Sequence, residues 1–185
     1  MKKLILILSV VILAVMASIT ATAATYGDLT YTVSNGEVTI TDCSTSAISV
    51  TIPSEIDGYP VTSIGNYAFR ECGSLTNITI PDSVTSIGYE AFRYCGSLTS
   101  ITIPDSVISI GKGAFSHCTS LTSITIQDGV TSIGDEAFNY CTGLPSITFP
   151  STVTSIGSST FNECINLKSV TIRDGVTSIG SSAFN

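Results

Sequence analysis

The chain has 185 residues, which is enough for one folding unit. Its net charge is −7, from 14 acidic and 7 basic residues. A chain with so few basic residues lacks the basic patches that pair with phosphates. Its composition therefore argues against a nucleic-acid partner and against an anionic membrane surface as a binding site. Because only 11% of the residues are charged, Ser and Thr must cover much of the exposed surface.

Residues 1–23 differ in composition from the rest of the chain. Two lysines precede the apolar run 4–17, and the small residues of Ala-Thr-Ala at 21–23 suit signal peptidase. We expect a secretory signal peptide that is cut before Ala24. Its removal leaves five basic and fourteen acidic residues, a net charge of −9.

The alternative for this segment is a retained membrane anchor. The apolar run is shorter than the ~20 residues that a spanning helix needs, and no basic stop-transfer cluster follows it. We therefore expect a secreted or cell-surface protein that is not inserted into the membrane after signal cleavage.

Residues 24–60 show strand patterns without a regular period. The segments 29–33 and 37–41 alternate apolar and polar residues around Asn35-Gly36, which is a strong hairpin signal. The run 48–52 is expected to be a further strand. Residues 55–60 are an insertion relative to the pattern that follows, and we expect them to form a surface turn.

From residue 61 the chain repeats a unit of 23 residues, such as SLTNITIPDSVTSIGYEAFRYCG at 74–96. A fixed period of this size is typical of a solenoid, in which neighbouring units bury one another's apolar faces. A solenoid also needs an atypical first unit. Residues 24–60 are therefore predicted to be an N-terminal capping hairpin with the first strand, and residues 61–185 the array.

Within one repeat the apolar positions are fixed while the others vary, so the fixed ones must face inward. The segment 98–103 favours a strand paired in parallel with its copies, and Pro104 ends it. Residues 107–110 predict a second brief strand, and 112–118 a helical turn or 3₁₀ piece. One inward set comprises Leu98, Ile101, Ile103, Val107, Ile110, Ala114, Phe115 and Cys118.

The pattern Leu-x-x-Ile-x-Ile-Pro-x-x-Val-x-x-Ile-Gly-x-x-Ala-Phe-x-x-Cys resembles the leucine-rich repeats of BspA-like bacterial surface proteins. The resemblance covers nearly all of the chain after residue 25. It implies a solenoid of 23-residue coils with a parallel β-sheet on one face and short strands, 3₁₀ or helical turns on the other. It also implies adhesion to host proteins such as fibronectin and fibrinogen, or to other cells.

The array stops at Asn185, before its last repeat would close. The final strand, 167–172, would present an unpaired edge and an uncovered apolar end. We expect either a fragment of a longer array or an end that another chain covers.

Five of the six cysteines occupy one repeat position and should form an inward row of buried free thiols. Cys43 could pair with Cys72 only if the insertion lets them approach, so a disulfide there stays open. The row consists of Cys72, Cys95, Cys118, Cys141 and Cys164.

No pattern indicates a metal, a cofactor or catalysis. There is no Cys-x-x-Cys, and His117, the single histidine, is expected to be exposed without a ligand role. A row of carboxylates could suggest calcium, but Asp residues in turns that accept backbone hydrogen bonds explain it better. That row consists of Asp82, Asp105, Asp128 and Asp174. No nucleophile elbow or phosphate loop occurs, so we do not expect an enzyme.

Two surfaces are candidates for binding. The first is a lattice of outward strand residues, which lacks the large anchors of tight interfaces and would need many copies to bind well. The second carries bulky residues near the predicted helical turn, among them Arg70, Arg93 and His117. The strand candidates are Thr76, Asn77, Thr79, Thr99, Ser100, Thr102, Thr122, Ser123 and Thr125, and the bulky candidates are Tyr67, Tyr89, Tyr94 and Tyr140.

The leading hypothesis is a secreted or surface-displayed module that binds extracellular proteins of a host matrix or of other cells through its repeats. One alternative is a structural spacer that displays another domain. Another is a glycan-binding or ice-binding lattice of hydroxyls.

Overall fold

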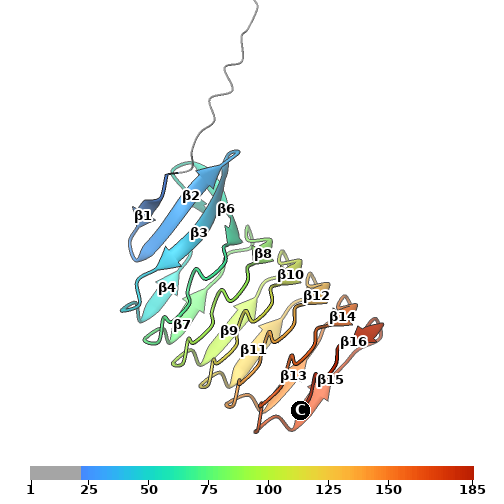
Figure 1. The fold of residues 1–185 in the computed structure, drawn as a ribbon. Coiled ribbons are helices and arrows are strands. Elements are labelled where there is room, and N and C mark those ends of the chain that lie inside the picture. Colours follow the sequence, from blue (N-terminus) through green and yellow to red (C-terminus); the bar gives the residue numbers. More distant parts are fainter. Residues whose placement is uncertain (1–21) are drawn as a thin grey trace, which may run out of the picture.

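The computed structural model describes residues 22–185, so the core of the predicted signal peptide lies outside the described residues. The described chain winds into coils that stack along one axis, from β1 at one end to β16 at the other (Figure 1). No helix in this range is long and apolar enough to cross a membrane.

The first coils begin with an antiparallel hairpin. β1 (Ala24–Tyr26) pairs with β2 (Leu29–Ser34), and β2 pairs with β3 (Glu37–Cys43). Asn35 and Gly36 form the β2–β3 turn with φ angles of 53° and 81°, the left-handed pair that a two-residue hairpin turn requires. We call residues 29–43 the N-terminal hairpin. Since β3 pairs in parallel with β6 (Tyr59–Ile64), this hairpin continues the sheet of the array.

The insertion forms a second, smaller hairpin. β5 (Glu55–Ile56) pairs antiparallel with β6 across Asp57 and Gly58, whose φ angles are also positive. The Tyr31 hydroxyl donates a hydrogen bond to the Asp57 carboxylate. The surface turn expected here is present, and it is tied back to the N-terminal hairpin.

Each later coil has a long strand and a short Ser-Ile strand. The short strands add in parallel to the mixed sheet that starts at β1, β2, β3 and β6, and we call it the short-strand sheet. It continues through β8 (Ser86–Ile87), β10 (Ser109–Ile110), β12 (Ser132–Ile133), β14 (Ser155–Ile156) and β16 (Ser178–Ile179). Equivalent residues 23 apart pair in register, as in Ser109 with Ser132.

The long strands do not form the continuous ladder that the repeat suggested. They associate in three parallel pairs, β4–β7, β9–β11 and β13–β15. We call this side the long-strand face. Its strands are β4 (Ser49–Thr51), β7 (Asn77–Thr79), β9 (Ser100–Ile103), β11 (Ser123–Ile126), β13 (Ser146–Thr148) and β15 (Ser169–Thr171).

Proline explains two interruptions of the long-strand face. At the closed β9–β11 junction the Gln127 N–H donates to the Ile103 carbonyl oxygen at 3.1 Å. Pro104 and Pro150 hold the equivalent position after β9 and β13 and have no N–H to give to the preceding coil. Consequently β7 does not pair with β9, and β11 does not pair with β13. We call a junction open where the long strands of neighbouring coils do not pair and closed where they do. β4 and β7 pair despite Pro81, so proline alone does not decide that junction.

Glycine accompanies two of the three closed junctions, β9–β11 and β13–β15. A Cβ on Gly129 would lie 1.5 Å from the Asp105 carbonyl oxygen, and one on Gly175 would lie 2.1 Å from that of Ser151. Gly129 and Gly175 lie in the two coils in which Gln127 and Arg173 stand at the proline position. Loss of proline and gain of glycine together let a coil lie closely on the one before it.

The core is a set of side-chain ladders that run along the axis. Successive phenylalanine rings stack with centroids 4.9 to 5.5 Å apart, from Phe69–Phe92 to Phe161–Phe184. Phe115, in the middle, is fully buried. The predicted stacking of equivalent side chains is confirmed, and each buried ring contributes about 1.5 to 3 kcal/mol.

All six cysteines are buried free thiols, in agreement with the prediction for the cysteine row. The thiols of Cys95, Cys118, Cys141 and Cys164 donate hydrogen bonds of 3.0 to 3.2 Å to phenylalanine carbonyl oxygens of the preceding coil. Burial raises the pKa of Cys164 to about 11. These thiols act as small apolar side chains with one satisfied donor.

The expected helical or 3₁₀ turns are replaced by reverse turns, and no helix occurs within residues 22–185. Two residues of a typical coil, such as Glu90 and Tyr94, have left-handed φ angles of 49° and 64°, which no right-handed helix can contain. Their N–H groups donate to Lys112 and Ser116 of the next coil at 2.9 and 3.0 Å. These hydrogen bonds between coils therefore stabilise the left-handed backbone at the two positions, and that backbone excludes a helix.

Candidate functional site

The nine predicted strand residues are all exposed on the long-strand face. Three of their hydroxyls are already used by the scaffold: Thr76, Thr99 and Thr122 each donate to a carbonyl oxygen of the preceding coil at 2.9 to 3.3 Å. The other six side chains remain available to a partner. The predicted outward orientation is thus confirmed, and five of the eight hydroxyls in the predicted lattice make no hydrogen bond within residues 22–185.

Two grooves mark the open junctions of this face. The first, between β7 and β9, has a volume of about 300 Å³, and the second, between β11 and β13, about 350 Å³. Each lining residue of the first groove has its equivalent two coils later in the second, as with Thr102 and Thr148. The alternation of open and closed junctions therefore creates a groove that recurs every two coils, which the 23-residue pattern alone did not reveal.

The bulky candidates lie on the side of the reverse turns. His117 stacks between Tyr94 and Tyr140 with both centroid distances at 4.6 Å, and the Arg93 guanidinium lies 4.9 Å from the Tyr94 ring centre. Tyr67 meets Tyr89 edge to face at 5.2 Å, with Arg70 over Tyr67. We call this surface the turn-face patch; it comprises Tyr67, Arg70, Tyr89, Arg93, Tyr94, His117 and Tyr140.

A buried carboxylate joins the two halves of this patch. Glu90 is 5% exposed, pairs with Arg93, and lies 3.4 Å from Arg70 Nη1. Burial alone would raise the pKa of Glu90, but hydrogen bonds from Tyr89 and Arg93 and the arginine charges outweigh it, so this pKa lies below its usual value. Sequence analysis missed Glu90, because its repeat position varies and nothing in the pattern marks it as buried.

The rings of the patch project from strained backbone. Tyr94, His117 and Tyr140 have φ angles of 64°, 61° and 57°, a region that bulky residues rarely adopt. Glu71 and Glu163 share this conformation, so the coil imposes it and aromatic residues are not its cause. The strain costs about 1 to 2 kcal/mol per residue, and stacking offsets about 0.5 to 1.5 kcal/mol for each pair.

His117 is partly buried between its two neighbours, which corrects the expectation that it is exposed. Burial and the nearby Arg93 charge lower the pKa of this imidazole. The ring is therefore neutral at pH 7, and the stack presents ring edges, phenol hydroxyls and an uncharged imidazole to solvent.

The row of aspartates does not have the expected role. Asp82, Asp105, Asp128 and Asp174 are exposed, and no hydrogen bond to their carboxylates is found within residues 22–185. Asp135 accepts a backbone hydrogen bond instead, from Ser158 N at 2.7 Å. In the same part of the chain no three His, Cys, Asp or Glu side chains gather as metal ligands would.

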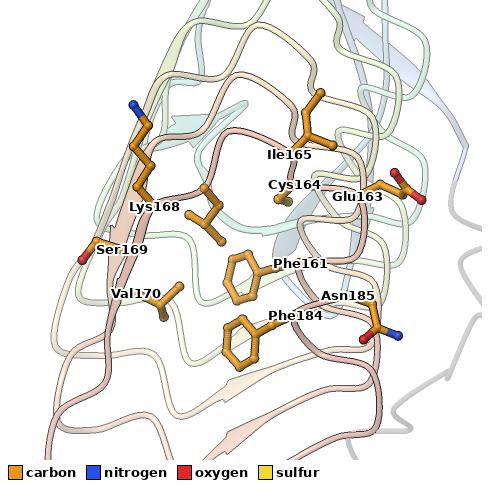
Figure 2. A pocket seen from close by; sticks show the side chains of 10 residues that line it. Phe161, Glu163, Cys164, Ile165, Lys168, Ser169, Val170, Phe184 and Asn185 are labelled. Carbon is orange, nitrogen blue, oxygen red and sulfur yellow. The ribbon is translucent and has the colours of Figure 1, made fainter.

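A hollow of about 330 Å³ opens at the last coil, between Phe161, Phe184 and Val170 (Figure 2). In the other coils the equivalent positions are covered by the next coil, and the matching phenylalanines are fully buried. Phe184 is 47% exposed. The hollow is a coil end rather than a shaped ligand site.

Two strands in each 23-residue coil, a shared apolar interior and a turn side stabilised by hydrogen bonds between coils define a β-solenoid of the leucine-rich repeat class. The model of the BspA-type leucine-rich repeat region matches six copies over residues 62–185. The chain belongs to this BspA-type leucine-rich repeat family.

Solved structures agree with this assignment. A leucine-rich cell surface protein of Faecalibacterium prausnitzii A2-165 is 38% identical with a TM-score of 0.81, over 91% of this chain and 47% of that chain. The leucine-rich repeat protein of T. pallidum is 28% identical with a TM-score of 0.76, over 86% of both chains. The chain spans about half the length of the first of these.

The pneumococcal vaccine antigen PcpA shares the fold alone, with 19% identity and a TM-score of 0.56 over 81% of this chain and 49% of that chain. No curated protein sequence matches.

Proposed function

We propose that the chain is a secreted or cell-surface module that binds extracellular proteins of a host matrix or of other cells, without catalysing a reaction. The observation that carries the proposal is the turn-face patch. It gathers tyrosines and arginines, the residue types in which binding energy concentrates at protein interfaces. Membership of a family whose structural relatives include a cell surface protein supports the setting.

The geometry of the patch suits a binding role. Its rings are fixed by stacking and by Arg93, so little side-chain freedom is lost when a partner docks. Three of the five basic residues after residue 23, Arg70, Arg93 and Lys112, lie beside or within it. An acidic molecule therefore carries much of its positive charge on the side that also holds its exposed aromatic rings.

The long-strand face plays the supporting role in this proposal. Its two grooves offer hydroxyl, amide and carboxylate groups in a spacing that repeats every two coils. Such contacts are individually weak and gain strength when several are made at once. A spacer would need neither surface, so binding by these residues separates the two hypotheses.

Binding to immobilised fibronectin and fibrinogen tests the proposal. We expect the triple variant Tyr94→Asn, His117→Asn and Tyr140→Asn to bind at least about tenfold more weakly, a loss of about 1.4 kcal/mol. Asn is chosen because it tolerates a left-handed backbone. The comparison variant Thr99→Ala, Ser100→Ala and Thr102→Ala removes a few weak contacts of the supporting long-strand face and should change the affinity by less than about threefold.

A wild-type chain that binds neither protein, or a triple patch variant that binds as well as wild type, would remove the support for this function. Circular dichroism and thermal unfolding of both variants verify that the coils remain folded.

A further inference from the structure

Two thiols between the N-terminal hairpin and the first coil differ from the other four. Cys43 ends β3, and Cys72 lies in the turn region after β6; the two side chains are 4% and 0% exposed. The Cys72 Sγ lies 3.7 Å from the carbonyl oxygen of Cys43 and 3.9 Å from that of Ser44. The Cys72 side chain thus points at the end of the hairpin.

These two thiols also interact with each other. The Cys43 Sγ lies 3.7 Å from the carbonyl oxygen of Ser44, which the Cys72 Sγ also approaches, and the neighbouring thiol raises the pKa of Cys43 and lowers that of Cys72. For Cys95, Cys118, Cys141 and Cys164 burial is the main influence and raises the pKa. Those four donate at 3.0 to 3.2 Å to phenylalanine carbonyl oxygens, whereas the carbonyl contacts of Cys43 and Cys72 are 3.7 Å or longer.

The spacing along the chain accounts for the difference. Cys43 and Cys72 are 29 residues apart, whereas Cys72 and Cys95 are separated by one repeat of 23. The later thiols therefore lie in a parallel row, which suits a disulfide dihedral poorly. Cys43 instead belongs to a strand of the hairpin, so it meets Cys72 from a different element.

We propose that Cys43 and Cys72 form a disulfide that fastens the N-terminal hairpin to the first coil of the array. Its presence on the natural protein rests on the export proposed above, because disulfides persist in oxidising compartments. The reaction itself does not depend on export or on any binding partner.

The oxidant is a small disulfide such as oxidised glutathione. Cys72, whose thiolate is the better stabilised of the two, attacks one glutathione sulfur, and the other glutathione leaves as a thiolate. The Cys43 thiolate then attacks the Cys72 sulfur of the mixed disulfide and displaces the second glutathione. One S–S bond is broken and one formed, and the two protons lost by the cysteines end on the two glutathione thiols.

A tryptic map after incubation in oxidised or reduced glutathione buffer tests the pairing. Free thiols are alkylated in denaturant before digestion. Cleavage after Arg70, Arg93 and Lys112 places Cys43, Cys72 and Cys95 on three separate peptides. We expect peptide 71–93 to be linked to the peptide that ends at Arg70, and the remaining four cysteines to be alkylated.

Thermal unfolding supplies a second readout. The oxidised protein should unfold roughly 5 to 10 °C above the reduced protein, because the link closes a loop in the unfolded chain. Cys43→Ser and Cys72→Ser should each abolish the difference, whereas the control Cys95→Ala should retain it.

Alkylation of all six cysteines in the oxidising buffer, or a link from Cys72 to Cys95, would overturn the proposal. Loss of binding to matrix proteins would leave it standing, so the two proposals fail separately.

Discussion

The backbone N–H of Gln127 donates a hydrogen bond to the carbonyl oxygen of Ile103 at 3.1 Å, across two coils of the solenoid. At the neighbouring junctions Pro104 and Pro150 occupy the position of Gln127 and cannot donate. At these three junctions one residue thus helps to decide whether two long strands pair or leave a groove between them.

Gln127→Pro should open the β9–β11 junction. The substitution removes the donor to Ile103, and we expect the free energy of unfolding to fall by about 1 to 3 kcal/mol. Chemical denaturation measures the loss. Gln127→Ala keeps the N–H and gives up only the side-chain bond to Asp105 N at 3.1 Å, so it should cost clearly less. Equal losses for the two variants would show that the N–H of residue 127 does not control the junction.

Gly129→Ala should be strongly unfavourable. Its Cβ would lie 1.5 Å from the Asp105 carbonyl oxygen, so the backbone of one coil has to move. We expect a loss of about 1 to 3 kcal/mol in the free energy of unfolding. The control is Gly96→Ala, whose Cβ meets nothing nearer than Thr119 Oγ1 at 3.7 Å and should change stability by about 0.5 kcal/mol or less. Indistinguishable denaturation curves would contradict the close packing of these coils.

Phe115→Ala tests the phenylalanine ladder at its centre. The ring is fully buried and stacks on Phe92 and Phe138 at 5.1 and 5.5 Å, so its removal leaves a void that costs about 3 to 5 kcal/mol. Phe184→Ala removes a ring that is 47% exposed and stacked on one side only. It should cost less than half as much in equilibrium unfolding. Comparable losses would mean that position in the ladder does not govern the contribution of a ring.

His117 should titrate below its ordinary pKa of 6.5, because burial and Arg93 disfavour the imidazolium. The chain holds one histidine, so a single NMR ring signal reports this pKa directly. Arg93→Gln should move the pKa upward, although burial still holds it below 6.5. A ring that titrates at or above 6.5 in the wild-type chain would contradict the stacked, partly buried position.

The lowered pKa of His117 also makes the free energy of unfolding depend on pH. The unfolded chain binds a proton at His117 more readily than the folded one, so the contribution of this residue is complete above pH 6.5 and is lost as the pH falls below that value. His117→Asn should remove this part of the pH dependence of the unfolding free energy.

Much of the architecture could be predicted from residue patterns. The hairpin around Asn35-Gly36, two strands in each coil, the inward rows and the stacked phenylalanines all follow from local turn chemistry and a strict period. The predicted helical turns were wrong because a pattern of apolar positions does not report φ. The left-handed residues are fixed by hydrogen bonds to the next coil, as from Tyr94 N to Ser116 O at 3.0 Å.

The candidate surfaces were predictable only in part. Outward strand residues and the tyrosines could be named, since position in the repeat determines which way a side chain points. That Glu90 is buried between two arginines, that His117 lies between two tyrosine rings, and that Cys43 meets Cys72 depend on contacts between residues 20 to 29 apart.

By itself, then, the amino-acid sequence determined the period, the inward and outward faces and the membership of each ladder, because a repeated pattern can be satisfied only by stacking equivalent positions. Only the tertiary structure decided which junctions close, which rings touch and which charges pair. Those outcomes depend on the distance between neighbouring coils, and that distance is set jointly by proline, glycine and backbone hydrogen bonds on both sides of each junction.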